Sequence, residues 1–181
     1  AATVRAIQLL GRQFVLGRHI GEAMDAADAQ RRAQAALRSS NAMPRRAPPG
    51  LRFSYDMLGE GARTDRDALR YLAAYQGAIA AIAARRVAGA GPEAGDGISI
   101  KLSALFPRYE DAQRERVFAE LLPRVWTLAD AAARADMNLT IDAEESDRLE
   151  LSLDVFEQLA ARVAREHPGW RGFGLAVQAY Q

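Results

Sequence analysis

Hydrophobic residues follow two alternating patterns along the chain after residue 50. Short, nearly continuous apolar runs are typical of buried strands, and apolar positions that recur every three or four residues are typical of amphipathic helices. The runs predict four strands, over residues 52–57, 98–102, 138–142 and 173–178. The periodic stretches predict three long helices, which run from 64 to the glycine-rich turn at 89–97, from about 111 to 135, and from 146 to about 166. We therefore expect strands and helices to alternate.

Local signals add detail to the three helices. Thr64 offers a side-chain acceptor at the start of the first helix, and Asp67 stands three residues later, as in a capping box. Pro123 lies within the second helix, which it should kink or restart because proline lacks a backbone N–H. The residues expected to face the core are Leu69, Leu72, Tyr75, Ile79 and Ile82 in the first helix, Val117, Leu121, Val125 and Leu128 in the second, and Leu149, Leu153, Phe156, Leu159 and Val163 in the third.

Four strands separated by long helices predict right-handed crossover connections in a parallel sheet. Successive strands begin about 40 residues apart, and eight such units would make a (β/α)8 TIM-type barrel of ordinary size. We therefore expect an α/β fold in which the chain covers about the first four β/α units of such a barrel. An open, doubly wound, four-stranded sheet is the structural alternative, although neither a Gly-x-Gly-x-x-Gly turn nor a Walker loop follows the first strand.

The first 50 residues are organised differently. Apolar residues at helical spacing over 3–16 and an alanine-rich stretch over 20–37 predict a helical arm, which we assign to residues 1–38. Residues 39–50 contain three prolines and two arginines, a composition that disfavours regular structure and is typical of a linker. These boundaries leave residues 51–181 for the half barrel.

Composition narrows the functional classes. The chain has 24 basic and 23 acidic residues and a net charge of +1, which gives no electrostatic reason to expect a nucleic acid partner. It contains no cysteine, so disulfides, thiolate metal sites and thiol nucleophiles are excluded. No apolar run approaches the roughly 18 residues of a membrane span, and the start of the chain lacks the layout of a signal peptide. We therefore expect a cytoplasmic protein.

One lysine differs from every other basic residue. Lys101 is the only lysine in the chain, and it lies at the polar end of the apolar run that contains Ile98, Ile100 and Leu102. Lysine carries a compact charge on a flexible stem, whereas arginine carries a broad planar one, so the exception indicates a position that arginine does not fill. An unpaired ammonium at a half-buried strand end would be costly, which makes a chance surface lysine the weaker interpretation.

Polar residues also end the other predicted strands. Asp56 and Glu60 follow the first strand, Asp142 follows the third, and Gln178 follows the fourth. In a parallel barrel these ends converge on the face where active sites are built. A pair formed by Lys101 and an aspartate on a neighbouring strand end would orient the lysine towards an anionic group, or it would be a structural ion pair that closes the barrel. Spacing alone leaves both interpretations open.

Three carboxylates within four residues, Asp142, Glu144 and Glu145, also fit a magnesium site in a metal-dependent lyase. However, adjacent side chains of an extended backbone turn to opposite faces, and acidic residues are favoured near a helix start. We therefore expect Asp142 to point inward, with Glu144 and Glu145 at the helix entry. His19 and His167 lie far from the strand ends in sequence, so a histidine general base is not expected.

Four stretches of the chain carry a family resemblance. They read Phe-Ser-Tyr-Asp-Met-Leu-Gly-Glu at 53–60, Gly-Ile-Ser-Ile-Lys-Leu-Ser-Ala-Leu-Phe-Pro-Arg-Tyr at 97–109, Leu-Thr-Ile-Asp-Ala-Glu-Glu-Ser-Asp-Arg-Leu-Glu at 139–150 and Val-Gln-Ala-Tyr-Gln at 177–181. In order and spacing they closely resemble the proline dehydrogenase domain of the bacterial bifunctional proline utilization flavoenzymes (PutA). Residues 10–24 are also similar to the helical arm that precedes the barrel in that family. Phe106 stands where the family usually has histidine.

The resemblance implies a distorted (β/α)8 barrel that holds FAD at the carboxyl ends of its strands. Such a domain oxidises L-proline to Δ1-pyrroline-5-carboxylate and passes the electrons to a membrane quinone. By resemblance, Lys101 would help to bind the proline carboxylate and Asp142 would sit beside it in the substrate pocket. Ala143 and Gln178 would contact the flavin, and Glu60 would form an ion pair that gates the pocket. Such an enzyme needs neither histidine nor cysteine, because the cofactor carries the chemistry.

The resemblance ends at the fourth strand. The second half of the family's barrel supplies the pair of arginines that clamps the carboxylate and most of the contacts to the FAD phosphates. We therefore expect this chain to be inactive alone and to have the rest of the barrel and an aldehyde dehydrogenase domain as partners, in the cytoplasm or peripheral to the inner membrane. The alternative is a non-catalytic barrel fragment that acts as a scaffold or interaction module. Its two open strand edges would favour oligomers.

Overall fold

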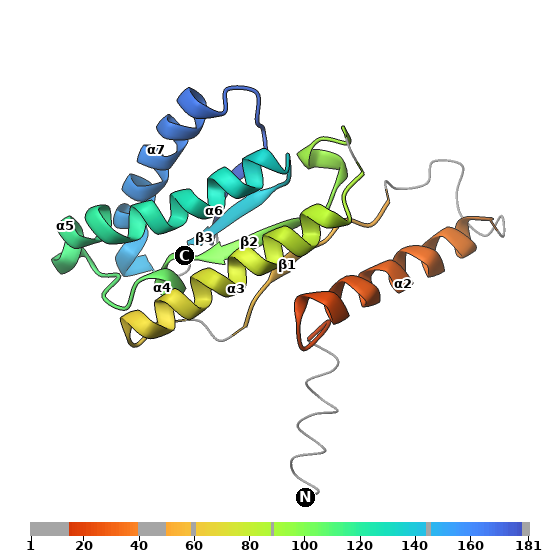
Figure 1. Ribbon diagram of the computed structural model, residues 1–181, viewed down its shortest axis with the longest axis horizontal. Helices are drawn as coiled ribbons and strands as arrows, with labels where there is room; N and C mark the ends of the chain where they lie inside the picture. The colour runs from red at the N-terminus through yellow and green to blue at the C-terminus, as the bar shows by residue number, and fades with distance from the viewer. Residues whose placement is uncertain (1–14, 40–49, 59–60, 88, 144–145, 179–181) are drawn as a thin grey trace, which may run out of the picture. The chain divides into compact units, whose positions relative to one another are not determined.

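The computed structural model describes residues 15–39, 50–58, 61–87, 89–143 and 146–178 (Figure 1). The chain divides into two compact units, residues 1–53 and 54–181. In the first unit, helix α2 spans Ile20–Ser39 and confirms the helix predicted over 20–37. The helix predicted over 3–16 and the linker predicted over 39–50 fall almost entirely outside the described residues.

The second unit is built on a parallel sheet whose strands lie in the order β1-β2-β3-β4 (Figure 1). All four predicted strands are present, each within two residues of its expected limits. Their bounds are Ser54–Asp56 for β1, Gly97–Lys101 for β2, Leu139–Ala143 for β3 and Phe173–Val177 for β4. The sheet formed by the described residues stays open, with β1 and β4 at its two edges, and does not close into a barrel.

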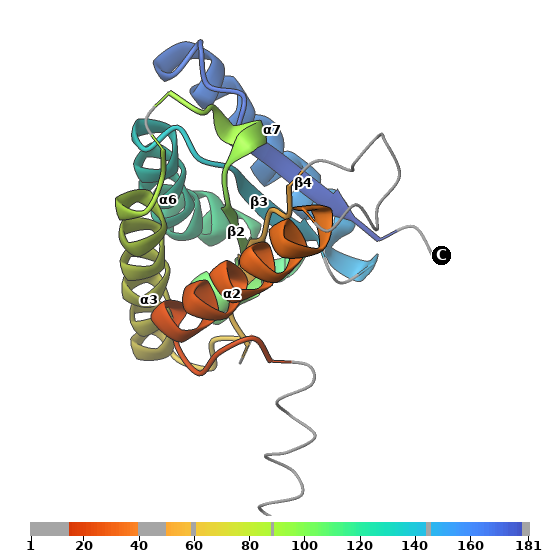
Figure 2. The ribbon, with the colours of Figure 1, turned by 90° about the vertical axis from the view of Figure 1, so that its right-hand side faces the viewer.

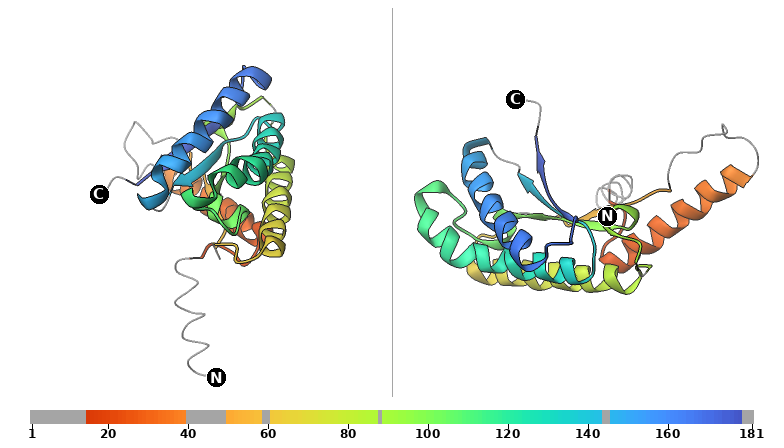
Figure 3. Two further views of the ribbon diagram at one scale, coloured as in Figure 1. Left: turned by 90° about the vertical axis from the view of Figure 1, so that its left-hand side faces the viewer. Right: turned by 90° about the horizontal axis from the view of Figure 1, so that it is seen from above.

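Three long helices connect the strands and cover one side of the sheet. They are α3 at Asp65–Ala84, α6 at Leu122–Arg134 and α7 at Leu149–Glu166. Figure 3 shows these helices, coloured yellow, teal and blue, on the same side of the strands. Right-handed crossovers between strands in sequential order produce this arrangement, whereas a doubly wound sheet needs a reversal of strand order that places helices on both sides. The doubly wound alternative is therefore wrong for the described strands.

Helix α3 begins as predicted. The Asp67 N–H donates to Thr64 Oγ1 at 3.1 Å, and the Thr64 N–H donates to Asp67 Oδ2 at 3.1 Å, which completes the capping box. Tyr75, Ile79 and Ile82 are buried as expected, but Leu69 is 52% exposed, so its assignment to the core was wrong.

The second crossover is less regular than the single helix predicted for it. A 3₁₀ turn at Asp111–Gln113 and the short helix α5 at Arg114–Arg116 lead into a π-helical segment at Val117–Leu121, after which α6 begins. Pro123 occupies the first turn of α6, where its missing N–H costs least, so the predicted restart is confirmed. The four residues expected to face inward, Val117, Leu121, Val125 and Leu128, are all fully buried.

Helix α7 follows a 3₁₀ turn at Ser146–Arg148, and its buried stripe agrees with the predicted one only at Leu159 and Val163. Its buried apolar residues recur every fourth position, at Leu151, Val155, Leu159 and Val163. Leu149 and Leu153 are 36% and 44% exposed, so their assignment to the core was wrong. The helix carries two neighbouring apolar stripes, and sequence periodicity does not tell which of them packs against the sheet.

Candidate functional site

The two faces of the sheet differ in chemistry. Alternation along the strands directs Ile98, Ile100, Leu139 and Ile141 to the helix-covered side, where all four are fully buried. The opposite side, here called the polar face, carries Ser54, Asp56, Gly97, Ser99, Lys101, Thr140, Asp142, Gly174 and Ala176. Figure 2 shows β2, β3 and β4 side by side. The interior of an ordinary barrel is filled by bulky branched residues, so these small and polar side chains leave room for a ligand.

Lys101 lies at the centre of the polar groups at the carboxyl ends of the strands. It is the last residue of β2, it pairs with Asp142 across the sheet, and its side chain is only 3% exposed. Its Nζ lies 2.6 Å from Asp56 Oδ1 and 3.6 Å from Asp142 Oδ2. The buried Tyr75 hydroxyl on α3 accepts the Lys101 backbone N–H at 3.2 Å. Three strands and one helix thus hold a single buried cation.

The Asp142 carboxyl in this group has a shifted pKa. Burial raises the pKa of Asp142 above its ordinary value, and the nearby charge of Asp56 adds to the rise, while Lys101 opposes it. Its side chain is 19% exposed, against 42% for Asp56. Burial thus favours the protonated form of Asp142.

The charges of the group limit what it can bind. One ammonium stands against two carboxylates, so the three side chains together do not favour an anion. An anionic ligand group placed against Lys101 needs additional cations from elsewhere in the protein. If Asp142 takes up a proton, the net charge of the three side chains changes from −1 to zero.

The other residues singled out from the sequence fall at different places. Ala143 is buried and follows Asp142 at the end of β3, where alternation turns its side chain to the helix-covered side. Gln178 is the first residue after β4 and is exposed. Glu60, Glu144 and Glu145 lie outside the described residues. Within the described ranges, no group of three or more histidine, cysteine, aspartate or glutamate residues could hold a metal ion.

Phe106, the departure from the family pattern, is buried between two arginines just after the short helix α4 at Leu102–Leu105. The guanidinium carbons of Arg116 and Arg124 lie 5.4 Å and 5.9 Å from the centre of its ring. Arg124 also donates to the Leu105 carbonyl oxygen at 2.9 Å. A neutral aromatic face attracts both guanidinium groups, so the phenylalanine fits its surroundings.

Sequence reasoning left one contact of Lys101 undecided and missed another. It expected the lysine to pair with an aspartate on a neighbouring strand end, but spacing did not tell that Asp56 lies closer than Asp142. Tyr75 was assigned to the core face of α3, and nothing in the helical periodicity indicates that its hydroxyl reaches the β2 backbone. The position of Asp56 at the end of β1 was the available signal for the first contact, and the second had none.

The length and hydropathy of the helices bear on whether the chain crosses a membrane. In the described part of the chain, no helix is both long enough and apolar enough to cross a bilayer.

Comparison with known proteins gives one consistent family. The family model described as proline dehydrogenase matches residues 36–181. The bifunctional protein PutA of Escherichia coli K12 is 47% identical over 176 residues, which are 97% of this chain and 12% of that protein. The bifunctional protein PutA of Rhizobium meliloti is 46% identical over 175 residues, with the same two coverages. The chain thus spans about an eighth of the length of these curated relatives.

Solved structures agree with the sequence matches. A mutant of proline utilization A (PutA) from Bradyrhizobium japonicum matches with a TM-score of 0.73 and 44% identity, covering 99% of this chain and 16% of that one. The PutA of Bdellovibrio bacteriovorus matches with a TM-score of 0.76 at 21% identity, covering 99% of this chain and 18% of that one, which supports the fold alone. From the family model and the identity to these relatives, we conclude that the chain belongs to the proline dehydrogenase family.

Proposed function

We propose that this chain is the amino-terminal half of a proline dehydrogenase domain, which oxidises L-proline to Δ1-pyrroline-5-carboxylate with FAD and passes the electrons to a quinone. Family membership supports proline as the substrate. The observation that carries the proposal is the buried ammonium of Lys101 at the carboxyl ends of three adjacent parallel strands, where enzymes of parallel α/β architecture place their active sites.

In this proposal Lys101 binds the carboxylate of proline, with Asp142 beside the ring. Because two aspartates already surround the ammonium, the substrate carboxylate needs further positive charge. The family resemblance assigns that charge to a pair of arginines in the second half of the barrel. Binding is therefore shared between this chain and the rest of the protein, and this chain by itself is inactive.

Asp142 has the properties of a proton-holding group next to the substrate. Its raised pKa favours the neutral form more than an exposed aspartate would, because burial penalises the charge. A neutral Asp142 also removes one of the two charges that repel the proline carboxylate. We assign it to the substrate pocket on these grounds.

The residues of β4 fit a planar cofactor over the polar face. Gly174 and Ala176 carry almost no side chain there, and a Cβ added at Gly174 would meet only Thr140 Oγ1, at 3.8 Å. In the proposal, the backbone of Ala143 at the end of β3 and the Gln178 residue after β4 would hold the flavin edge, and Glu60 would gate the pocket. When bound, FAD supplies the acceptor for the hydride removed from proline.

The open edge strands support a longer barrel. β1 and β4 each have one neighbour among the described strands, and the singly wound order is the one that continues into a (β/α)8 barrel. We propose that four further β/α units close the barrel and that an aldehyde dehydrogenase domain follows. The same open edges favour the second candidate, a non-catalytic scaffold or interaction fragment, for which light scattering should show oligomers of the chain produced alone.

The proposal is tested on the complete protein. We expect a yellow preparation that reduces a dye with L-proline. We expect Lys101→Ala to raise the KM for proline by about 100-fold, because a buried charged partner of the carboxylate is lost, with flavin content unchanged. Arg85→Ala, which removes a cation at the far end of α3, serves as the matched control and should behave like the unmodified enzyme. An unchanged KM for Lys101→Ala would remove its role, and a colourless protein without proline oxidation would remove the function.

A further inference from the structure

Asp56 is closer to Lys101 than any other acidic side chain that the structure describes. Its Oδ1 lies 2.6 Å from Lys101 Nζ, whereas Asp142 Oδ2 lies 3.6 Å away. We propose that Asp56 is a positioning residue, whose carboxylate fixes the Lys101 ammonium where it receives the substrate carboxylate. The inference rests on the proposed function, in which Lys101 binds proline.

The register of the sheet explains how Asp56 reaches the lysine. Asp56 pairs with Ser99, which lies two residues before Lys101 on the same side of β2. A side chain at this diagonal position points to the neighbouring polar group from the adjacent strand. The contact therefore follows from the pairing of β1 with β2 and does not depend on a loop.

The short strand β1 is fixed to β2 on both of its faces. On the polar face, Ser54 Oγ and Ser99 Oγ are 3.1 Å apart and share a hydrogen bond. On the helix-covered face, the buried Tyr55 donates its hydroxyl to Asp96 Oδ2 at 3.0 Å. Asp56 follows both anchors directly, so its carboxylate starts from a fixed backbone.

A lysine needs such a partner more than most cations do. Its ammonium sits on a four-carbon stem with large rotamer entropy, so a free side chain would visit many positions. A charge-assisted hydrogen bond of 2.6 Å restricts those positions. The Tyr75 hydroxyl holds the backbone N–H of the same residue at 3.2 Å, so both ends of the lysine are fixed.

Two physical effects of removing Asp56 have opposite signs. Loss of one negative charge next to Lys101 makes the site more favourable for an anion, which would lower the KM for proline. Loss of the fixed position lets the ammonium move away from the substrate carboxylate, which would raise the KM. If Asp56 positions Lys101, the second effect exceeds the first.

The first experiment measures steady-state kinetics of the complete protein. We expect Asp56→Ala to raise the KM for L-proline about tenfold and to change kcat less, since a strong hydrogen bond to a charged group is lost. Asp56→Asn retains an acceptor oxygen and should fall between the wild type and Asp56→Ala. In a Lys101→Met background, Asp56→Ala should have no further effect, because it acts through the lysine. Glu93→Gln removes one negative charge from the exposed turn at Pro92–Ala94, which precedes β2, and should leave both parameters unchanged.

Three outcomes of the kinetics would overturn the proposal. These are a lower KM in either Asp56 variant, an unchanged KM in both, and a full additional effect in the Lys101→Met background. The Asn variant is nearly isosteric, so it keeps the test valid if the Ala variant folds poorly.

The second experiment reads Lys101 itself and needs no proline oxidation. The rate of acetylation of Lys101 in the folded complete protein is measured by mass spectrometry of the peptide that contains it. We expect the lysine to react several-fold faster in Asp56→Asn than in the wild type or in Glu93→Gln, because the ammonium is no longer held by a carboxylate. Equal rates would overturn the positioning role. A protein that fails to oxidise proline but shows the faster rate would contradict the proposed function and leave the contact between Asp56 and Lys101 established.

Discussion

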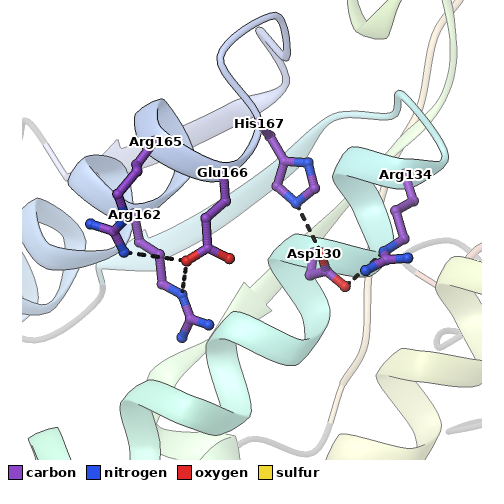
Figure 4. Close-up of polar contacts among 6 residues, drawn as sticks. All are labelled: Asp130, Arg134, Arg162, Arg165, Glu166 and His167. Carbon is purple, nitrogen blue, oxygen red and sulfur yellow. Dashed lines mark hydrogen bonds and ion pairs between the residues drawn. The ribbon is translucent and has the colours of Figure 1, made fainter.

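Two polar clusters of the second unit shift carboxyl pKa values in opposite directions. At the carboxyl ends of the strands, the strand-end cluster of Asp56, Lys101 and Asp142 surrounds a cation that is 3% exposed. At the carboxyl ends of α6 and α7, and so on the amino side of the strands, the helix-end cluster consists of Asp130, Arg134, Arg162, Arg165, Glu166 and His167 (Figure 4).

The pairs of the helix-end cluster are ordinary in length, and their side chains range from 21% exposed for His167 to 75% exposed for Arg134. Asp130 accepts from Arg134 at 2.9 Å and lies 2.8 Å from His167 Nε2, and Glu166 accepts from Arg162 at 2.9 Å. Hydrogen bonds from Arg134, and secondarily from His167, hold the pKa of Asp130 below its ordinary value. The hydrogen bond from Arg162 likewise lowers the pKa of Glu166. Here the fold favours the charged carboxylates.

The strand-end cluster does the reverse for Asp142. Its carboxylate also has a cationic neighbour, but burial outweighs that neighbour and the pKa of Asp142 rises. The comparison teaches that the balance between burial and hydrogen bonding, more than the presence of a cation, decides the direction of the pKa shift. A carboxyl whose charged form is disfavoured by burial is typical of a functional site, whereas the helix-end cluster is typical of structural surface pairs.

The largest expected effect on stability comes from the anchor of the strand-end cluster. Tyr75→Phe removes the hydroxyl that accepts the buried Lys101 N–H, which should lower the free energy of unfolding by about 1.5 kcal/mol because a buried hydrogen bond is lost. Thr127→Val removes a hydroxyl bond to the Pro123 carbonyl on an exposed helix surface and should cost less, about 0.5 kcal/mol. Hydrogen exchange of the β2 backbone, measured by mass spectrometry, checks the difference. Equal protection in both variants would show that the Tyr75 contact is dispensable.

The next effect is the loss of the shared acceptor in the helix-end cluster. Asp130→Asn should destabilise the junction of α6 and α7 by about 1 kcal/mol at neutral pH, the upper range for surface pairs, since both Arg134 and His167 lose a charged partner. Because the folded pKa of Asp130 is lowered, its contribution is complete above the ordinary value of 3.8 and disappears as the pH falls through the lowered pKa. Hydrogen exchange of peptides within 122–134 and 149–167 measures it. A variant as stable as the wild type at neutral pH would contradict the assignment.

The same substitution in the strand-end cluster should have the opposite sign. Asp142→Asn should stabilise the fold at neutral pH, by no more than about 1 kcal/mol, because a carboxylate whose charged form is disfavoured becomes neutral. With a raised folded pKa, the cost of the charge is present above that pKa and is relieved as the pH falls through it towards 3.8, so wild type and variant should converge in acid. Thermal unfolding at neutral and acidic pH tests both statements. Destabilisation at neutral pH would mean that the pairing with Lys101 outweighs burial.

The strands and their polar ends could be predicted because both depend on local order in the sequence. Short apolar runs such as Ile98–Ile100 are typical of strands in a buried parallel sheet. In such a sheet the polar residues that end the runs lie at one edge. The closer partner of Lys101 could not be predicted, because the difference between 2.6 Å and 3.6 Å depends on register and side-chain reach. The exposure of Leu149 and Leu153 could not be predicted either, since two apolar stripes compete for one surface. The π-helical segment before Pro123 had only the proline as its signal.

The smallest effect separates the two partners of Asp130. The Arg134 side chain is 75% exposed and pairs with Asp130 one turn earlier in the same helix, so Arg134→Gln should cost only about 0.4 kcal/mol and less in high salt. His167 is 21% exposed and also stacks on Trp126 with ring centres 5.8 Å apart, so His167→Gln removes packing as well as the pair and should cost more. Hydrogen exchange of residues 122–134 in both variants, at low and high salt, shows which substitution costs more stability. A larger, salt-independent loss in Arg134→Gln would mean that the helix-end cluster is more than a set of surface pairs and would remove the contrast with the strand-end cluster.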